Sequence, residues 1–300
     1  MLLTFFGGKG GVGKTTLSNA YALGRSKQER VLVVSTDPAH NLGHLWHQEI
    51  GPQPVTVREN LDLVELDPEK ATHAHLAQAG EAMRAHMPER LHKEVDKHLE
   101  LAAASPGTHE AALLEQMAVL IEGHEGAYDH IIFDTAPSGH TARLMALPEL
   151  MSAWTDGLLK RRDKADKFAD VVGSLGGETK SQRRDAELRS ILYRRRTRFE
   201  HLRNALRSST FNIVLTAERL PVMETIELYT ELAEHRIPVG ELFINRRSPA
   251  ALPGRRAVEE AALATLCAAL PGVPVTELPL LDYEVGSPEA LEEVATYLQR

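Results

Sequence analysis

The chain has 300 residues, of which 43% are hydrophobic and 25% charged, as expected for one large α/β domain or one domain with an inserted lobe. Its formal net charge of −8 argues against general nucleic-acid binding, because proteins with that activity present a basic surface. The single cysteine, Cys267, excludes an intrachain disulfide, and no apolar run is long enough to span a membrane. We therefore expect a cytoplasmic protein that is not integral to a membrane, with Cys267 buried in a helix.

The first predicted strand, residues 2–6, leads directly into a glycine-rich loop at residues 8–16. The loop matches the pattern G-x-x-x-x-G-K-[ST], whose glycines let backbone N–H groups surround a phosphate. Lys14 would reach the β- and γ-phosphates, Thr15 would offer its hydroxyl to Mg²⁺, and the following helix would point its N-terminus at the anion. The predicted ATP-binding residues here are Gly8, Lys9, Gly10, Gly11, Val12, Gly13, Lys14, Thr15 and Thr16. Because a strand and this loop occupy the first residues, we expect no signal peptide.

Apolar runs recur along the rest of the chain and predict the strands of a mostly parallel sheet. After residues 2–6 they occupy residues 31–34, 61–66, 130–133, 211–215, 240–244 and 273–278. Amphipathic helices that separate most of these strands are predicted at residues 15–27, 221–234, 255–270 and 288–299. This alternation is typical of a doubly wound α/β fold.

Two stretches interrupt the alternation, at about residues 69–126 and 150–208. Neither contains a convincing strand, and both have helical character. They lie on either side of the strand at 130–133, so they could pack together. We therefore predict a single P-loop ATPase domain over residues 1–300, with a helical subdomain formed by these two insertions.

Carboxylates follow two of the predicted strands, at the edge where α/β sheets bind ligands. Asp37 follows residues 31–34 and would hold the nucleophilic water or a water on Mg²⁺, although an ordinary Asp-Pro turn is the alternative. Asp134 follows residues 130–133 and would bind Mg²⁺ through water. Glu218 and Asn245 end two later strands. Because an asparagine can pair with adenine and the guanine-reading T-K-x-D sequence is absent, we expect ATP rather than GTP.

The second lysine of the loop, Lys9, makes the sequence K-G-G-x-G-K-T-T resemble the deviant Walker A loops of SIMIBI-type P-loop NTPases. The segments STDPAHNL at 35–42 and DTAPSGHT at 134–141 resemble the switch segments of the ArsA and tail-anchored-protein targeting ATPase family. The segment ELPLL at 277–281 is similar to the adenine loop of that family.

This resemblance implies a Mg²⁺-dependent ATPase that works as a homodimer. Asp37 would then be the catalytic aspartate of the first switch, and Lys14 and Thr15 would hold phosphate and metal. Lys9 would cross the dimer interface and act at the nucleotide of the partner. By the same resemblance, Glu218, Asn245 and Pro279 would contact the nucleotide.

The cysteine count separates this chain from several relatives. One cysteine cannot build the multi-thiolate site that arsenite needs. No C-x-x-C follows Asn245, which excludes a zinc bridge between subunits, and two cysteines per subunit for an iron–sulfur cluster are lacking. We expect a targeting factor or chaperone for hydrophobic, tail-anchored-like membrane-protein segments. The alternative is an ATPase subunit that drives a membrane transporter, though not for arsenite. A ParA/MinD-type positioning ATPase is a third, weaker interpretation, because a basic surface or C-terminal membrane helix is missing.

Two apolar stripes in the insertions are candidates for a client groove. The first comprises Leu147, Leu150, Met151, Trp154 and Leu158. The second comprises Leu76, Met83, Met87, Leu91, Val95 and Leu99. Packing of these faces against each other, as the core of the subdomain, is the competing interpretation.

Overall fold

The computed structural model describes residues 1–37, 41–86, 89–103, 105, 107–135, 147 and 180–298. The chain divides into two compact units. We call the first the sheet unit; it comprises Met1–Pro68, Gly123–Met145 and Ala205–Arg300. We call the second the helical unit; it comprises Glu69–Glu122 and Ala146–Asn204. That these units form one ATPase domain with an inserted subdomain stays a prediction.

An eight-stranded sheet runs through the sheet unit in the order β3-β4-β2-β5-β1-β6-β7-β8. Its neighbouring strands are parallel except for β3, which pairs antiparallel with β4. The strands are β1 (Leu2–Gly7), β2 (Val31–Ser35), β3 (Val55–Arg58), β4 (Leu61–Glu65), β5 (His130–Asp134), β6 (Thr210–Thr216), β7 (Val239–Arg247) and β8 (Val275–Pro279). The predicted doubly wound, mostly parallel α/β fold is confirmed. Only β3 was missed, because four residues that alternate with polar side chains give a weak signal.

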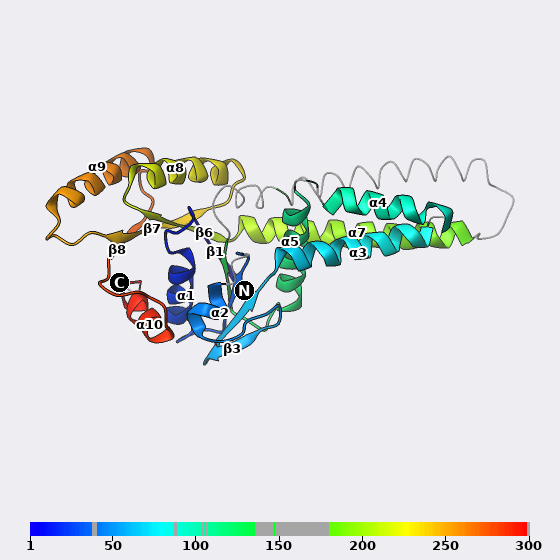
Figure 1. Ribbon diagram of the computed structural model, residues 1–300, viewed down its shortest axis with the longest axis horizontal. Helices are drawn as coiled ribbons and strands as arrows, with labels where there is room; N and C mark the ends of the chain where they lie inside the picture. The colour runs from blue at the N-terminus through cyan, green and yellow to red at the C-terminus, as the bar shows by residue number, and fades with distance from the viewer. Residues whose placement is uncertain are drawn as a thin grey trace. The chain divides into compact units, whose positions relative to one another are not determined.

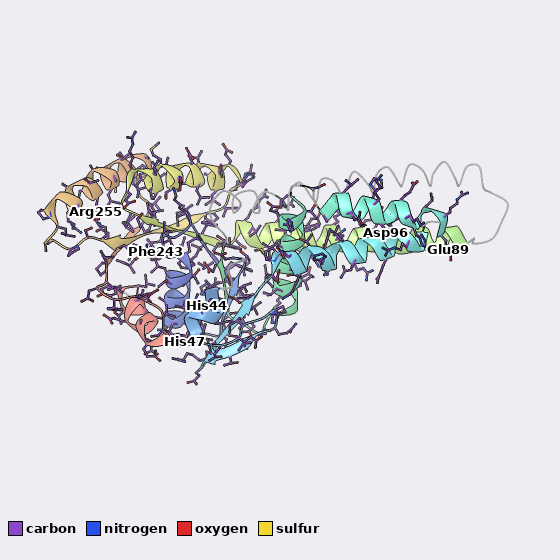
Figure 2. All side chains as sticks on the ribbon, in the orientation of Figure 1. His44, His47, Glu89, Asp96, Phe243 and Arg255 are labelled. Carbon is purple, nitrogen blue, oxygen red and sulfur yellow. The ribbon has the colours of Figure 1, made fainter. Side chains whose placement is uncertain are left out.

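Helices cover both faces of this sheet (Figure 1). On one face lie α1 (Lys14–Arg25), α2 (Asn41–Trp46) and α10 (Pro288–Tyr297), and on the other lie α8 (Arg219–Glu234) and α9 (Pro253–Ala269). Phe6 stacks on Phe243 of β7 at 5.7 Å between ring centres, inside the core cluster that includes residues of α1 and α10 (Figure 2). The neighbouring Phe5 points to the opposite face, as strand geometry requires, and stacks on Phe133 at 4.8 Å.

Cys267 lies in α9 and is exposed, so the prediction that it is buried was wrong. The helix buries Glu259, Ala262 and Leu266 instead. Successive residues of an α-helix are rotated by about 100° from each other, so the residue after Leu266 turns toward solvent. The uniformly apolar run around Cys267 does not reveal which face of the helix packs.

The helical unit is built from α3 (Pro68–His86), the short 3-10 helix η1 (Glu89–Leu91), α4 (His92–Ala103), α5 (Thr108–Gly123) and α7 (Lys180–Arg207). Glu115 of α5 joins three of them, because its carboxylate bonds to His75 of α3 at 2.7 Å and accepts from Arg195 of α7 at 2.6 Å. Burial raises the pKa of Glu115, but the hydrogen bonds from His75 and Arg195 outweigh it and bring the pKa to about 2. The acid therefore stays charged and holds the helices together.

The apolar stripe that begins at Leu76, in the first insertion, contains both buried and exposed side chains. Val95 is buried, whereas Met83 is 36% exposed. Of the stripe in the second insertion, Leu150, Met151, Trp154 and Leu158 lie outside the described residues. Whether the stripes form a groove or a core stays open. Among the residues that the structure describes, no helix is long and apolar enough to cross a membrane.

Candidate active site

The loop between β1 and α1 has a backbone that only glycine tolerates at two positions. Gly8 has φ of 139° and Gly13 has φ of 100°, both in the region that favours glycine. A Cβ atom on Gly8 would lie 2.1 Å from the carbonyl oxygen of Val214 in β6, and one on Gly13 would lie 2.4 Å from Nδ2 of Asn245. The loop is therefore pressed against the ends of β6 and β7.

We expect Gly8→Ala to lower the free energy of unfolding by about 3 kcal/mol or more, because backbone strain and a backbone clash add. Gly11 is a matched control, since its φ is 79° but a Cβ atom there would meet nothing within 4 Å. Gly11→Ala should cost only about 1 kcal/mol. Urea unfolding of the nucleotide-free proteins measures both values. Equal losses would contradict the close approach to Val214.

The N-terminus of α1 offers main-chain donors to an anion. The first bond within the helix runs from the N–H of Leu17 to the carbonyl of Gly13 at 3.0 Å, so the N–H groups of residues 14–16 have no partner within the helix. Lys14 is buried, and its Nζ donates to the carbonyl oxygen of Lys9 at 3.1 Å. Burial lowers the pKa of Lys14, although Asp134 and Asp37 act in the opposite direction. The loop and helix together fit a phosphate chain.

Asp134 lies at the centre of the sheet edge, where it faces Phe6 of β1 and Ser35 of β2 in the strand register. Its carboxylate is fully buried, and neither oxygen has a hydrogen bond of normal geometry in the described residues. The hydroxyl of Thr15 and the ammonium of Lys14 are near enough to lower its pKa. Burial dominates, however, and raises the pKa of Asp134 to about 7.

The donor set around Asp134 fits a magnesium ion. Mg²⁺ prefers oxygen ligands and keeps several waters, and it binds through one or two protein oxygens plus the phosphates of its substrate. A buried carboxylate that lacks well-formed hydrogen bonds to the described residues, beside a threonine hydroxyl, supplies such ligands. Thr15 would hold the ion directly, and Asp134 and Asp37 would hold it through water.

We expect Asp134→Asn to make the metal-free protein more stable above neutral pH while it abolishes hydrolysis. A carboxyl whose pKa rises from 3.8 to about 7 on folding keeps its proton in the folded protein at pH values where the unfolded chain has lost it. Wild-type stability therefore falls as pH rises from about 4 to 7, by up to about 4 kcal/mol, and stays low above that range. Asparagine does not titrate.

Thermal melts of both proteins in a chelating buffer at several pH values would measure this difference. The stability advantage of the variant should widen between about pH 4 and 7 and stay constant above that range. A difference that does not depend on pH would contradict a buried, titrating Asp134. Assays of ATP hydrolysis with added Mg²⁺ should show that Asp134→Asn has lost activity.

Asp37 lies beside this centre. Its neighbour Thr36 donates its N–H to the carbonyl oxygen of Asp134 at 2.9 Å, and the N–H of Asp37 donates to Oγ of Ser35 at 3.3 Å. These bonds fix the chain at the end of β2 against the end of β5. Together with Lys14, the structure thus brings Asp37 and Asp134 to one point at the mouth of the loop.

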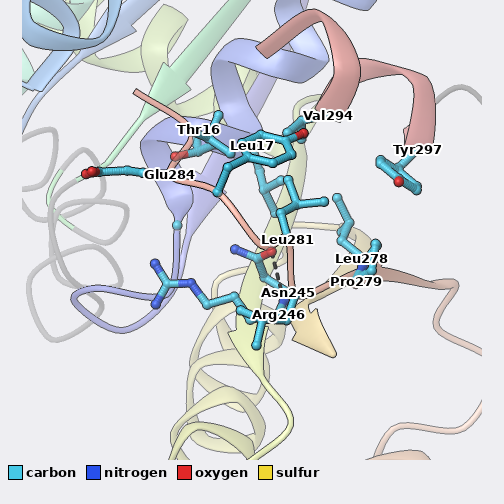
Figure 3. Close-up of a pocket in the computed structure, with 14 residues that line it drawn as sticks. Thr16, Leu17, Asn245, Arg246, Leu278, Pro279, Leu281, Glu284, Val294 and Tyr297 are labelled. Atoms are coloured by element: carbon cyan, nitrogen blue, oxygen red, sulfur yellow. Dashed lines mark hydrogen bonds between the residues drawn. The ribbon is translucent and has the colours of Figure 1, made fainter. Parts of the chain in front are cut away.

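A pocket of about 270 Å³ lies beside the start of α1 and fits a nucleotide base (Figure 3). Asn245 and Pro279 line it, as do Thr16 and Leu17 of α1. Nδ2 of Asn245 donates to the carbonyl of Val12 at 2.8 Å, and its Oδ1 accepts from the N–H of Arg246 at 2.9 Å. Because an amide oxygen accepts two hydrogen bonds, Oδ1 can still receive one from a base.

Leu278, Leu280 and Leu281 of the segment that resembles the adenine loop also line this pocket, but several other lining residues were not predicted from the sequence: Tyr283, Glu284, Val285, Val294 and Tyr297. The last two belong to α10, which packs along α1. The amphipathic pattern predicted this helix, but nothing in the pattern shows that it borders the site.

A buried ionic cluster fixes the strand end beside Pro279. Arg247 of β7 donates to Oε2 of Glu259 in α9 at 2.6 Å and to Oε2 of Glu277 in β8 at 2.6 Å. The carbonyl of Arg247 accepts from the N–H of Leu280 at 2.8 Å. This cluster holds β8 in register and so sets the wall of the base pocket.

Of the three nucleotide contacts predicted outside the phosphate loop, Asn245 and Pro279 line the base pocket and Glu218 does not. It borders a second hollow of about 640 Å³ together with Lys9, Gly10 and Gly11. Its carboxylate pairs with Arg255 of α9. The structure therefore groups Glu218 with Lys9 rather than with Asn245 and Pro279, and its contact with nucleotide stays a prediction.

Lys9 lies on the outer side of the loop. Its Nζ is 2.7 Å from Oε1 of Glu224 in α8, and the two side chains are 41% and 37% exposed. No local pattern in the sequence indicates this pair, because the residues are 215 positions apart in the chain.

Comparison with known proteins identifies a family and relatives that match nearly the whole chain. The family described as "Anion-transporting ATPase" matches residues 1–300. A relative from Aquifex aeolicus, "Putative arsenical pump-driving ATPase 2", is 30% identical over 305 residues, covering 99% of each chain. An "ATPase ASNA1 homolog" from Trypanosoma cruzi is 30% identical over 331 residues, covering 98% of this chain and 90% of the relative.

The "Arsenical pump-driving ATPase" of Escherichia coli is 31% identical over 303 residues, which cover 96% of this chain but 48% of the relative. The chain thus spans about half of that protein and nearly all of the two others. Because the family match extends over the whole chain and the loop, Asp134 and base pocket fit a nucleotide, the chain belongs to the anion-transporting ATPase family and is an ATPase.

Proposed function

We propose that this protein is a Mg²⁺-dependent ATPase that acts as a dimeric switch and escorts hydrophobic segments of membrane proteins. The observation that carries the switch is the meeting of Lys14, Asp134 and Asp37 at the mouth of the loop, with Lys9 directed to the outside. A site that hydrolyses ATP within one subunit needs the first three. An exposed second lysine at the rim suits contact with another subunit.

The residues would divide the work as follows. The main chain of the loop and Lys14 hold the β- and γ-phosphates, and Asn245 and Pro279 hold the base. Asp37 orients the attacking water. A bound Mg²⁺ would neutralise charge on the phosphate oxygens. Because phosphoryl transfer depends on positioning and charge, a missing positive charge at the γ-phosphate leaves turnover slow until Lys9 of a second copy supplies it.

Exposed apolar side chains near Lys9 and its partner Glu224 support a second copy of this chain as the neighbour of Lys9. Leu220 is 67% exposed, Leu252 is 50% exposed and Met223 is 46% exposed. Leu220 and Leu252 border the same hollow as Lys9. A face-to-face arrangement of two such loops would cover these side chains and bring each Lys9 to the nucleotide of the other copy.

The client role rests on the resemblance to tail-anchored-protein targeting ATPases and on the apolar stripes of the helical unit. The test is co-expression of the Asp37→Asn protein with a single-span tail-anchored segment, followed by copurification. Met83→Asp should abolish capture, because Met83 is a partly exposed member of a stripe. Val119→Asp is the matched control, since Val119 is 48% exposed in the same unit but outside the stripes.

The client groove would be supported if Met83→Asp abolishes copurification of the segment, Val119→Asp does not, and both variants still bind ATP. The absence of capture by a folded, ATP-bound dimer would reject it. Leu150→Asp and Trp154→Asp test the second stripe in the same way.

A second candidate function is an ATPase subunit that drives a membrane transporter. It is favoured by relatives whose names describe arsenical pump-driving ATPases. Arsenite itself is an unsuitable solute, because one cysteine per chain cannot provide several thiolates. Copurification of the wild-type protein with a polytopic membrane protein, in place of a tail-anchored segment, would favour this candidate.

A further inference from the structure

The ion pair between Lys9 and Glu224 joins the phosphate loop to α8 of the same subunit. Lys9 Nζ lies 2.7 Å from Glu224 Oε1. The second oxygen, Oε2, is buried and has no hydrogen-bond partner in the described residues, although the side chain as a whole is 37% exposed. The carboxylate is therefore turned inward at α8, and Lys9 is drawn toward that helix.

A second contact holds the main chain of Lys9. Its carbonyl oxygen accepts a hydrogen bond from Nζ of Lys14 at 3.1 Å. Lys14 is the lysine that would bind the β- and γ-phosphates, so a bound nucleotide competes with the carbonyl for its ammonium. Nucleotide binding thus releases one of the two contacts of Lys9 and leaves the ion pair with Glu224 in place.

The other acids near this face are less suited to the same role. Glu218, at the start of α8, is paired with Arg255. Glu227 lies one turn further along α8 and is exposed, and no ion pair joins it to Lys9 in the part of the chain that the structure describes. Glu224 is therefore the acid that acts on Lys9 in this structure.

We propose that Glu224 is a positioning residue that holds Lys9 on its own subunit and so restrains its transfer to the nucleotide of a second copy. This inference rests on the proposed action of Lys9 across a dimer. Lys9 cannot contact Glu224 and a nucleotide in another subunit at once. The ion pair must break when the dimer closes, and its loss subtracts from the stability of the closed dimer.

The experiment compares Glu224→Gln with the unaltered protein in an Asp37→Asn background, where ATP persists. Sedimentation velocity with ATP should show dimer dissociation constants that are about two- to fivefold lower for Glu224→Gln, as expected for release of a half-exposed ion pair. Glu224→Asp, whose shorter side chain keeps the charge but moves it from Lys9, should also tighten the dimer. Glu227→Gln removes the same charge from the same helix and should leave the dimer unchanged.

With Asp37 intact, Glu224→Gln should raise turnover by a similar factor at protein concentrations below the dissociation constant and leave it unchanged when the dimer is saturated. A general structural effect would not depend on protein concentration in this way. Added salt should reduce the difference between the two proteins, because it screens the ion pair.

The controls separate this inference from the proposed function. In a Lys9→Ala background, Glu224→Gln should have no effect. If Lys9→Ala weakens the dimer but Glu224→Gln does not strengthen it, or strengthens it equally without Lys9, the inference is overturned and the proposed function stands. If Lys9→Ala changes neither dimer nor turnover, the proposed function is overturned, and the inference with it.

Discussion

Replacement of Asp37 by asparagine is expected to lower the turnover number for ATP hydrolysis by about 10³-fold while ATP affinity changes little. The carboxylate stands where β2 ends beside Asp134, and bonds from Thr36 and Asp37 to neighbouring residues fix its backbone there. An amide keeps the shape but cannot orient and polarise an attacking water as a carboxylate does. The phosphate contacts, which come from the loop and Lys14, are unaffected.

Single-turnover hydrolysis and equilibrium binding of ATP with Mg²⁺ separate the two quantities. Asp62→Asn is a suitable control, since Asp62 lies in β4 away from the loop and bonds to Tyr128. Near-normal turnover in Asp37→Asn would leave only the Asp-Pro turn as the role of this residue.

Replacement of Lys9 by alanine is expected to reduce turnover by a factor on the order of 10³ or more, as does removal of a charge supplied by a second subunit in related phosphoryl-transfer chemistry. The monomer should fold normally, because Lys9 is 41% exposed and its pair with Glu224 contributes little to stability. The ATP-dependent dimer should weaken in parallel. Lys14→Ala, in contrast, should abolish ATP binding itself.

Mixing provides the decisive comparison for Lys9. In a mixture of Lys9→Ala and Lys14→Ala proteins, a heterodimer contains one subunit that binds ATP and lacks Lys9, and another that cannot bind ATP but supplies Lys9. If Lys9 acts on the nucleotide of the other subunit, this mixture should hydrolyse ATP although neither protein does so alone. Continued inactivity of the mixture, with formation of the heterodimer demonstrated, would contradict it.

The central part of the fold could be predicted from the sequence because it depends on local signals. Runs such as residues 31–34 and 130–133 are buried on both faces and read as strands without knowledge of their neighbours. The phosphate loop is equally local, because spacing alone determines which glycines and lysines share one turn. The family comparison then confirmed the ATPase expected from that loop.

The parts that were missed depend on contacts between distant residues. The pairing of Lys9 with Glu224, and the approach of Tyr297 to the base pocket, arise from the packing of α8 and α10 and leave no local pattern. The prediction for Cys267 failed for a related reason, since a short apolar run does not show which face of α9 is turned inward. The grouping of Glu218 with Lys9 likewise required the sheet order.

The buried cluster of Arg247 and Glu259 constrains how this sequence can diverge. The side chains are 5% and 3% exposed, so loss of either partner leaves a buried charge that only a half-exposed residue still pairs with, Glu277 for Arg247 and Arg255 for Glu259, at a cost of up to about 3–5 kcal/mol. Replacement of both by well-packed apolar residues costs far less. Neutral drift at one position is therefore blocked while the other persists, and the two residues should be inherited or exchanged together. Selection on the stability of this ion pair would therefore preserve the wall of the nucleotide pocket during evolution, although neither residue contacts the substrate.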